Sequence, residues 1–330
     1  MARILVVTPD AQGVRTGNTV TGERIDQLLS GLDHRVEVTS QYTGQIADVL
    51  IVMHAKRGAA SLQAFRQDQP DRPIILMLTG TDLYGDMQED CVSLAALCAA
   101  TRLVVLQPAA LAMLDPEQRS RARVVHQSVV PPSGLASEPG PGLQVCVVGH
   151  LRSVKDPLRM AEAARLLPPE SEVRVVQLGA ALCPELEAAA REEDAGNPRY
   201  TWRGEVSSDE VFEVMAASRL HVLTSESEGG PSAICEALAL GLPTVTSRID
   251  GALGMLGMDY PGTFPFGDTK ALAAMVGRFE LDASFRDDLV RRTDGLRSLV
   301  DPATELAAWQ VILDELGIPS PSLAPTAPTG

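Results

Sequence analysis

Short apolar runs alternate with helical patterns through the first part of the chain. The runs that predict strands are RILVVT at 3–8, VEVTS at 36–40, DVLIVMH at 48–54, PIILMLTG at 73–80, RLVVLQ at 102–107 and RVVHQSV at 123–129. The segments that predict helices lie at 22–32, 61–67, 91–100 and 111–122. Parallel strands joined by helices fit this alternation better than an antiparallel meander. The pattern predicts a doubly wound α/β sheet over residues 1–134.

A stretch rich in proline, glycine and serine, PPSGLASEPGPG at 131–142, interrupts this pattern and predicts a domain boundary. A second series follows, with strands predicted at 143–150, 173–180, 200–205, 220–225 and 243–248. Helices are predicted between them at 184–194, 207–218 and 232–241. The series predicts a second doubly wound, Rossmann-like domain over 143–298.

The last part of the chain contains helical patterns from about Lys270 to Gly317 and then a Pro/Ser/Thr-rich tail. We expect the tail, 318–330, to be disordered, because it has no core-forming pattern. An alternative in which the helices near 300–317 pack back on the first domain stays open. Two such domains are expected to place the carboxyl ends of two sheets across one cleft, an arrangement suited to an enzyme with two substrates.

Composition excludes several kinds of partner. The 330 residues, 45% hydrophobic, suffice for two cores, while 43 acidic against 28 basic residues give a formal charge of −15. Such a charge disfavours nucleic acid and anionic membranes as partners. No apolar run reaches the ~20 residues of a membrane span, and MARILVVTPD does not resemble a signal peptide. We therefore expect a cytoplasmic protein, whose oligomeric state the sequence leaves open.

Five cysteines without a C-x-x-C pair predict neither a disulfide framework nor a zinc site. Their expected role is as small core hydrophobes, with a reactive thiol as the alternative.

The segment TSESEGGPSAICEALALG, from Thr224 to Gly241, has the pattern of an anion site. A strand is predicted to end at Ser225, a glycine loop follows, and a helix begins near Ser232. Backbone N–H groups at a helix start lack partners within the helix and carry the positive end of its dipole, so a diphosphate can bind there. Glu228 and Glu236 stand eight residues apart and could border the same ligand, although a glutamate on a helix is usually solvated.

These residues resemble the E-x7-E region of retaining-type GT-B glycosyltransferases. The resemblance implies that Glu228 contacts the hydroxyls of the donor sugar and Glu236 the hydroxyls of the ribose. It assigns the phosphates to the backbone at Gly229, Gly230, Pro231 and Ser232.

Two further segments are similar to parts of the same family. GHLRSVKDPLR parallels G-R-x-x-x-x-K and implies that Lys155 binds the diphosphate and stabilises leaving-group charge. Gly149 matches, but His150 stands where the family has arginine; Arg152 is either its replacement or a solvated side chain. YTWRGEV resembles the segment beside the nucleotide base, which assigns Trp202 and Gly204 to a uracil, unless Trp202 belongs to the core.

A narrower resemblance covers nearly the whole chain. TPDAQGVRTGNTVTGERI, LIVMHAKRGAASLQAFR, LTGTDLY, VVHQSV, NPRYTWRGE and GMDYPGTFPFGDT are similar to the GT-B-like selenosugar synthases of selenoneine biosynthesis. This family implies a UDP-sugar donor, UDP-N-acetylglucosamine first among them, and selenophosphate as the selenium source. The implied product is a 1-selenosugar with a C–Se bond, formed with release of UDP and phosphate.

The first domain suits a small anionic acceptor, because three loops at strand ends carry cations and polar groups. Their candidate residues are Arg15, Gly17 and Asn18 in the first loop, His54, Lys56 and Arg57 in the second, and Thr79, Gly80, Thr81 and Asp82 in the third. Converging strand-end loops can form a phosphate-sized pocket. The alternatives are that the glycines shape turns, the cations are solvated and Asp82 caps a helix. Selenophosphate carries ionised selenium, so His54 is expected to orient rather than act as a base.

No D-x-D motif stands at a predicted strand end, and a lysine with helix amides can neutralise a diphosphate. The sequence therefore predicts catalysis without a metal or another cofactor. Two other functions stay open: a conventional UDP-sugar O-glycosyltransferase acting on a sugar, lipid or natural product, and a catalytically silent nucleotide-sugar-binding protein.

Overall fold

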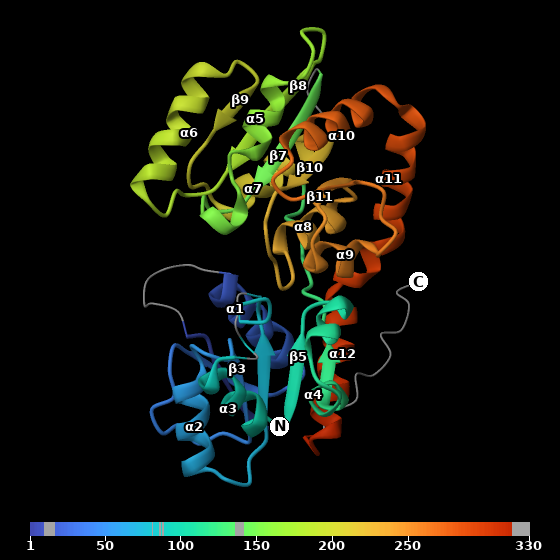
Figure 1. The fold of residues 1–330 in the computed structure, drawn as a ribbon. Helices are drawn as coiled ribbons and strands as arrows, with labels where there is room; N and C mark the ends of the chain where they lie inside the picture. Colours follow the sequence, from blue (N-terminus) through green and yellow to red (C-terminus); the bar gives the residue numbers. More distant parts are fainter. Residues whose placement is uncertain (10–16, 81, 86, 88, 136–141, 319–330) are drawn as a thin grey trace, which may run out of the picture. The chain divides into compact units, whose positions relative to one another are not determined.

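A computed structural model describes residues 1–9, 17–80, 82–85, 87, 89–135 and 142–318. The chain divides into two units, which are considered separately (Figure 1). Unit 1 comprises Met1–Gln127 with Pro302–Gly330, and unit 2 comprises Ser128–Asp301.

Unit 1 is built on a parallel sheet whose strand order is β2-β1-β3-β4-β5-β6. The strands are β1 Arg3–Val7, β2 Arg35–Thr39, β3 Val49–Met53, β4 Ile74–Leu78, β5 Arg102–Val105 and β6 Ala122–Val124. Every residue of β3 and β4 is buried, as expected of central strands covered by helices on both faces. This double burial explains why the strands appear in the sequence as continuous apolar runs.

Helices cover both faces of this sheet. They are α1 Gly17–Ser30, α2 Ala59–Asp68, α3 Cys91–Ala99, α4 Pro116–Arg121 and α12 Pro302–Glu315, with a 3-10 helix, η1, at Pro108–Met113. Phe65 and Leu97 pack on one face, while Ile25 and Trp309 pack on the other. Glu305 of α12 accepts a hydrogen bond from the Arg24 guanidinium at 2.9 Å, which fastens α12 to α1.

Two details of the predicted elements in unit 1 were wrong. The helix predicted over 111–122 divides into η1 and α4, because Asp115 forms a capping box with Gln118 and Pro116 begins a new helix. Ile318, placed in the predicted tail, is instead buried in the core of unit 1. The remainder of that tail lies outside the described residues.

Unit 2 is a second parallel sheet, with strand order β12-β11-β10-β7-β8-β9. Its strands are β7 Leu143–Val148, β8 Val173–Leu178, β9 Tyr200–Trp202, β10 Leu220–Leu223, β11 Thr244–Ser247 and β12 Thr263–Phe264. Its helices are α5 Arg159–Arg165, α6 Pro184–Gly196, α7 Ser208–Ala217, α8 Ser232–Leu240, α9 Asp250–Leu256, α10 Thr269–Leu281 and α11 Ala283–Leu296, with 3-10 helices η2 Ser153–Lys155 and η3 Arg297–Val300.

Each sheet has a point where the chain reverses the direction in which it adds strands. In unit 2 this point lies between the hydrogen-bonded strands β7 and β10, and in unit 1 it lies between β1 and β3. Loops leaving the carboxyl ends of two such strands diverge and leave a crevice in which open α/β sheets bind ligands. The two parallel sheets with their helices confirm the predicted α/β class.

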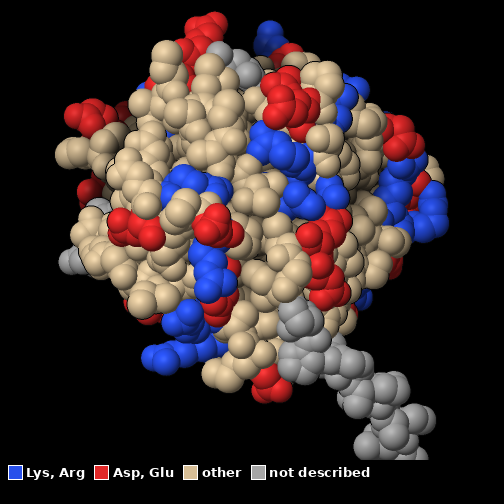
Figure 2. All heavy atoms as spheres, turned by 90° about the horizontal axis from the view of Figure 1, so that it is seen from below, with Lys and Arg blue, Asp and Glu red and all other residues tan. Residues whose placement is uncertain are grey.

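The surface agrees with the mixed charge of the sequence. On the face drawn in Figure 2, acidic and basic side chains are interspersed, and no large area carries one sign. Within the described ranges, no helix combines the length and apolar character needed to cross a bilayer. The cytoplasmic location stays a prediction.

Candidate donor-binding site

The loop between β10 and α8 carries the strongest motif of the sequence. After β10 ends at Leu223, the chain runs through Glu228 to Pro231, and α8 begins at Ser232. Pro231 occupies the N-cap position, and no side chain caps the helix there. The N–H groups of the first turn are therefore not taken by a capping side chain, which suits an anionic ligand.

Lys155 and Glu228 form an ion pair at the carboxyl ends of β7 and β10. The Lys155 Nζ donates to Glu228 Oε1 at 2.5 Å, and the Ser225 hydroxyl donates to the same oxygen at 2.7 Å. Lys155 is 27% exposed and Glu228 12% exposed in their side chains. Partial burial of this kind strengthens an ion pair relative to one on the open surface.

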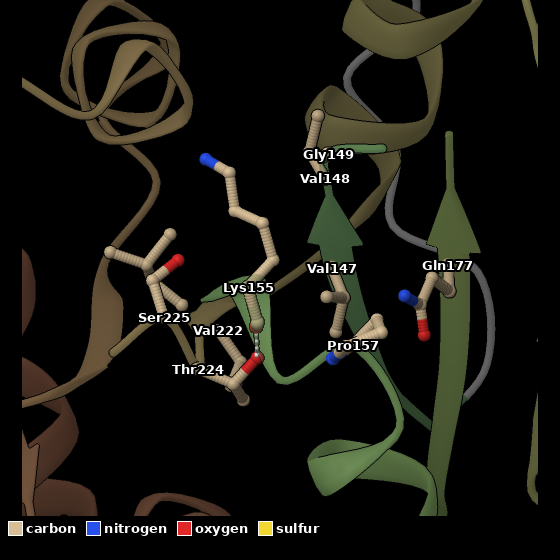
Figure 3. Close-up of a pocket in the computed structure, with 10 residues that line it drawn as sticks. Val147, Val148, Gly149, Lys155, Pro157, Gln177, Val222, Thr224 and Ser225 are labelled. Atoms are coloured by element: carbon tan, nitrogen blue, oxygen red, sulfur yellow. Dashed lines mark hydrogen bonds between the residues drawn. The ribbon is translucent and has the colours of Figure 1, made fainter. Parts of the chain in front are cut away.

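Backbone contacts hold the two loops together. The Thr224 hydroxyl donates to the Lys155 carbonyl at 2.8 Å, drawn as the dashed line in Figure 3, and the Glu226 N–H donates to the Val154 carbonyl at 2.8 Å. Asp156, directly after Lys155, takes the left-handed conformation with φ of 44°. These contacts bring Lys155 from the loop after β7 against the loop after β10.

Glu236 lies in the second turn of α8 among buried apolar neighbours and is half-buried. Burial raises the pKa of its carboxyl to about 7, and the positive charge of Lys155 partly opposes this shift. In the described part of the chain, no residue donates a hydrogen bond to Glu236. A ligand hydroxyl near Glu236 would find an acceptor that the protein has not satisfied.

His150 and Gly149 form the first turn of the loop after β7. The Ala180 N–H donates to His150 Nδ1 at 3.2 Å, which fixes the orientation of the ring. Gly179 has φ of 135°, and a Cβ there would stand 2.1 Å from the Gly149 carbonyl oxygen. Only glycine fits at position 179, and its close approach aligns the loops after β7 and β8.

Trp202, Gly204 and Arg152 have different surroundings. The Trp202 indole N–H donates to the Gly179 carbonyl at 3.0 Å, and the Arg191 guanidinium lies 5.6 Å from the ring centre. Gly204 accepts a hydrogen bond from the Gly179 N–H at 2.8 Å. Trp202 and Gly204 thus both hold Gly179, in the loop after β8. Arg152 is exposed and forms no ion pair with the residues that the structure describes.

Sequence reasoning missed several residues that shape this site. Ser225 holds the Glu228 carboxylate, and the Ser247 hydroxyl donates to the Ser225 carbonyl at 2.5 Å. Gly251 of α9 packs directly on Glu228, since a Cβ at position 251 would lie 2.0 Å from the Glu228 carbonyl oxygen. The sequence contains RIDG here, but nothing in that pattern indicates which backbone it meets.

In unit 1, the Asp82 side chain binds backbone groups of two loops. Its carboxylate accepts hydrogen bonds from the backbone N–H groups of Ala55 at 2.9 Å, Thr79 at 3.0 Å and Gly80 at 2.9 Å. The residue is 4% exposed. Asp82 therefore joins the loop after β3 to the loop after β4, and direct contact of its carboxylate with an acceptor stays a prediction.

The three candidate residues in the loop after β3 differ in burial and in their contacts. His54 is buried, with the unusual φ of 67°, and its Nδ1 accepts from the Arg57 N–H at 3.3 Å. Lys56 is 54% exposed and lies 3.4 Å from a carboxylate oxygen of Asp90. Arg57 is exposed. The two cations thus face solvent beside a constrained histidine.

The first loop of unit 1 is described only in part. Gly17 and Asn18 begin α1, directly after the loop that leaves β1. Arg15 and Thr81 lie outside the described residues. The loops at the carboxyl ends of β1 and β3 leave the sheet at its reversal point, where the ligand of an open α/β sheet is expected.

Comparison with known proteins agrees with the fold and with the motif in unit 2. Residues 137–294, slightly less than half of the chain, match the family described as Glycosyl transferases group 1. This segment contains Lys155, Glu228 and Glu236. No curated protein sequence matches the chain.

Solved structures resemble the chain over nearly its whole length. HepE (Alr3699) of Anabaena, in complex with UDP and glucose, is 17% identical with a TM-score of 0.71, and the match covers 96% of this chain and 100% of HepE. Sucrose-phosphate synthase of Thermosynechococcus elongatus is 15% identical with a TM-score of 0.74, over 96% and 99% of the two chains. These similarities confirm the predicted GT-B fold.

Proposed function

We propose that the protein is a selenosugar synthase that transfers a hexosamine from UDP-N-acetylglucosamine, or a related UDP-sugar, to the selenium of selenophosphate. The bond between the anomeric carbon and the UDP oxygen breaks as a C–Se bond forms. Water then cleaves the P–Se bond, so that a 1-selenosugar, UDP and phosphate leave. The pairing of Lys155 with Glu228 at the carboxyl ends of β7 and β10 is the observation that carries the glycosyltransferase part of this proposal.

The donor is assigned to unit 2. Lys155 and the N–H groups at the start of α8 supply positive potential for the diphosphate, while Glu228 and Glu236 supply acceptors for hydroxyls. As UDP leaves, negative charge develops on its β-phosphate, and a cation at this position lowers the barrier. That HepE was solved with UDP and with UDP-glucose supports a UDP-linked donor.

The acceptor is assigned to unit 1, and its loops favour an acceptor that arrives already ionised. Both carboxylate oxygens of Asp82 are taken by backbone N–H groups. Nδ1 of His54 is likewise taken by the Arg57 N–H. A sugar hydroxyl gains from a base that accepts its proton, whereas selenophosphate needs little help of that kind. Lys56 and Arg57 provide charge for its phosphate group.

The test measures how fast the purified protein releases UDP from UDP-N-acetylglucosamine under anaerobic conditions. Three acceptors are compared: selenophosphate, orthophosphate and a free sugar. We expect release with selenophosphate alone, and a loss of at least ~100-fold in Lys155→Met, which removes the cation at the leaving group. Release with the sugar but not with selenophosphate would assign the protein to the O-glycosyltransferases. UDP binding without release under any condition would identify a catalytically silent binding protein.

A further inference from the structure

Lys155 does not extend freely into the crevice of unit 2, because Glu228 holds it. The ammonium contacts Glu228 Oε1 at 2.5 Å, and this oxygen also accepts from the Ser225 hydroxyl. None of the residues that the structure describes donates to the other carboxylate oxygen, Oε2. Oε1 of Glu228 thus accepts two hydrogen bonds within the protein, whereas Oε2 accepts none from the described residues.

The space beside this pair is small. The cavity lined by Gly149, Lys155, Thr224 and Ser225 has a volume of about 10 Å³, which is close to the minimum for one water molecule. Figure 3 shows the Lys155 side chain between Ser225 and Gly149. A diphosphate is much larger than a water molecule, so it would contact Lys155 from outside this cavity or displace the side chains that line it.

We propose that Lys155 exchanges partners when the donor binds. In the free protein the ammonium is held by Glu228; in the complex it pairs with the diphosphate, and the released carboxylate accepts a hydroxyl of the donor sugar. The proposal rests on the proposed function, because it takes the ligand of unit 2 to be a nucleoside diphosphate sugar.

The surroundings of Glu228 suit both states. Ser225 keeps its hydrogen bond to Oε1 when Lys155 leaves, so the carboxylate retains its position. Gly251 packs directly against the backbone of Glu228. Only the lysine, whose long side chain has several rotatable bonds, needs to turn. The exchange leaves the ammonium paired with an anion in both states, while the carboxylate keeps the hydrogen bond from Ser225 and gains one from the sugar.

The exchange predicts an unusual result: neutralising Glu228 should strengthen the binding of UDP. Glu228→Gln removes the carboxylate that competes for Lys155, and UDP lacks the donor sugar whose hydroxyl Glu228 is proposed to bind. We expect about tenfold tighter binding of UDP, the scale of a half-buried ion pair. UDP-N-acetylglucosamine should gain less, because its sugar hydroxyl loses an ionised acceptor, and turnover should fall.

The experiment is a titration calorimetry cycle with UDP as the probe. It compares the wild type, Glu228→Gln, Lys155→Met and the double variant, with Glu226→Gln as a control that removes the same charge from an exposed position two residues away. We expect tightening in Glu228→Gln, weakening in Lys155→Met, no gain from Glu228→Gln in the Lys155→Met background, and binding within about twofold of wild type in Glu226→Gln. Thermal unfolding checks that each variant is folded.

Three outcomes would overturn the exchange. Equal tightening by Glu228→Gln in both backgrounds would mean plain repulsion between the carboxylate and UDP. Unchanged or weaker binding in Glu228→Gln, with Lys155→Met still weakened, would mean that the pair persists in the complex. Absence of UDP binding in every folded variant, wild type included, would instead remove the proposed donor site itself.

Discussion

Gly251→Ala tests whether the position of Glu228 controls activity. A Cβ at position 251 would lie 2.0 Å from the Glu228 carbonyl oxygen, 2.8 Å from its carbonyl carbon and 3.0 Å from its Cβ. Cβ atoms do not approach other atoms within 3.0 Å, so the carbonyl must withdraw by at least 1.0 Å. The three Glu228 atoms belong to the backbone or are attached directly to it, so they cannot move away by rotation of a side chain.

A displacement of this size carries a predictable cost. A shift of about 1 Å in a group that positions substrate can lower activity ~100-fold, which corresponds to about 2.7 kcal/mol of transition-state stabilisation. Overpacking in a tight contact destabilises a fold by about 1–3 kcal/mol. We therefore expect kcat/KM for UDP release to fall about 100-fold in Gly251→Ala, with a lowered but cooperative unfolding transition.

The matched control is Gly295→Ala in the same unit. Gly295 also lies in a helix, α11, but a Cβ there meets nothing within 4 Å. Alanine in an open helical position stabilises by up to about 1 kcal/mol and should leave kinetics unchanged. Wild-type kinetics in a folded Gly251→Ala variant would refute the reasoning that Glu228 needs this backbone position.

Three further predictions concern titration, thiols and metals. Burial raises the pKa of Glu236 from 4.5 to about 7, so between these pH values the folded state holds a proton that the unfolded chain releases. The stability of the fold is therefore lost as pH rises from 4.5 to about 7. Glu236→Gln should raise Tm more at pH 8 than at pH 5, and an equal effect at both pH values would contradict the shift. Burial raises the pKa of the Cys146 thiol to about 12, so mass spectrometry after iodoacetamide treatment should find Cys91 and Cys98, both exposed, alkylated and Cys146 modified only after denaturation. Because Lys155 and helix amides are expected to neutralise the diphosphate, UDP release should continue in EDTA and should not rise with added Mg²⁺.

Much of the fold could be predicted because its central strands are buried on both faces. The runs at 48–54 and 73–80 contain β3 and β4, each buried throughout. The order of strands within each sheet could not be predicted, since periodicity carries no information on neighbours. The predicted ends of one helix were also wrong, because the capping box at Asp115 starts a new helix inside an apparently continuous helical pattern.

The candidate site could be predicted only as a set of residue types. The motif around Glu228 and Glu236 placed both residues on one loop and helix, as observed. The contact of Lys155 with Glu228 joins residues 73 positions apart and depends on β7 and β10 being neighbours. The three backbone N–H groups that Asp82 binds could not be predicted, because its local sequence does not reveal them.

The central claim is that this protein forms a C–Se bond on a sugar carried by UDP. The most direct measurement is mass spectrometry of an anaerobic reaction containing the protein, UDP-N-acetylglucosamine and selenophosphate, beside a reaction without selenium. We expect a hexosamine product with the isotope pattern of selenium, formed together with UDP and reduced at least ~100-fold in the Lys155→Met reaction. UDP release without selenium in any product would contradict the claim and leave a glycosyltransferase with another acceptor.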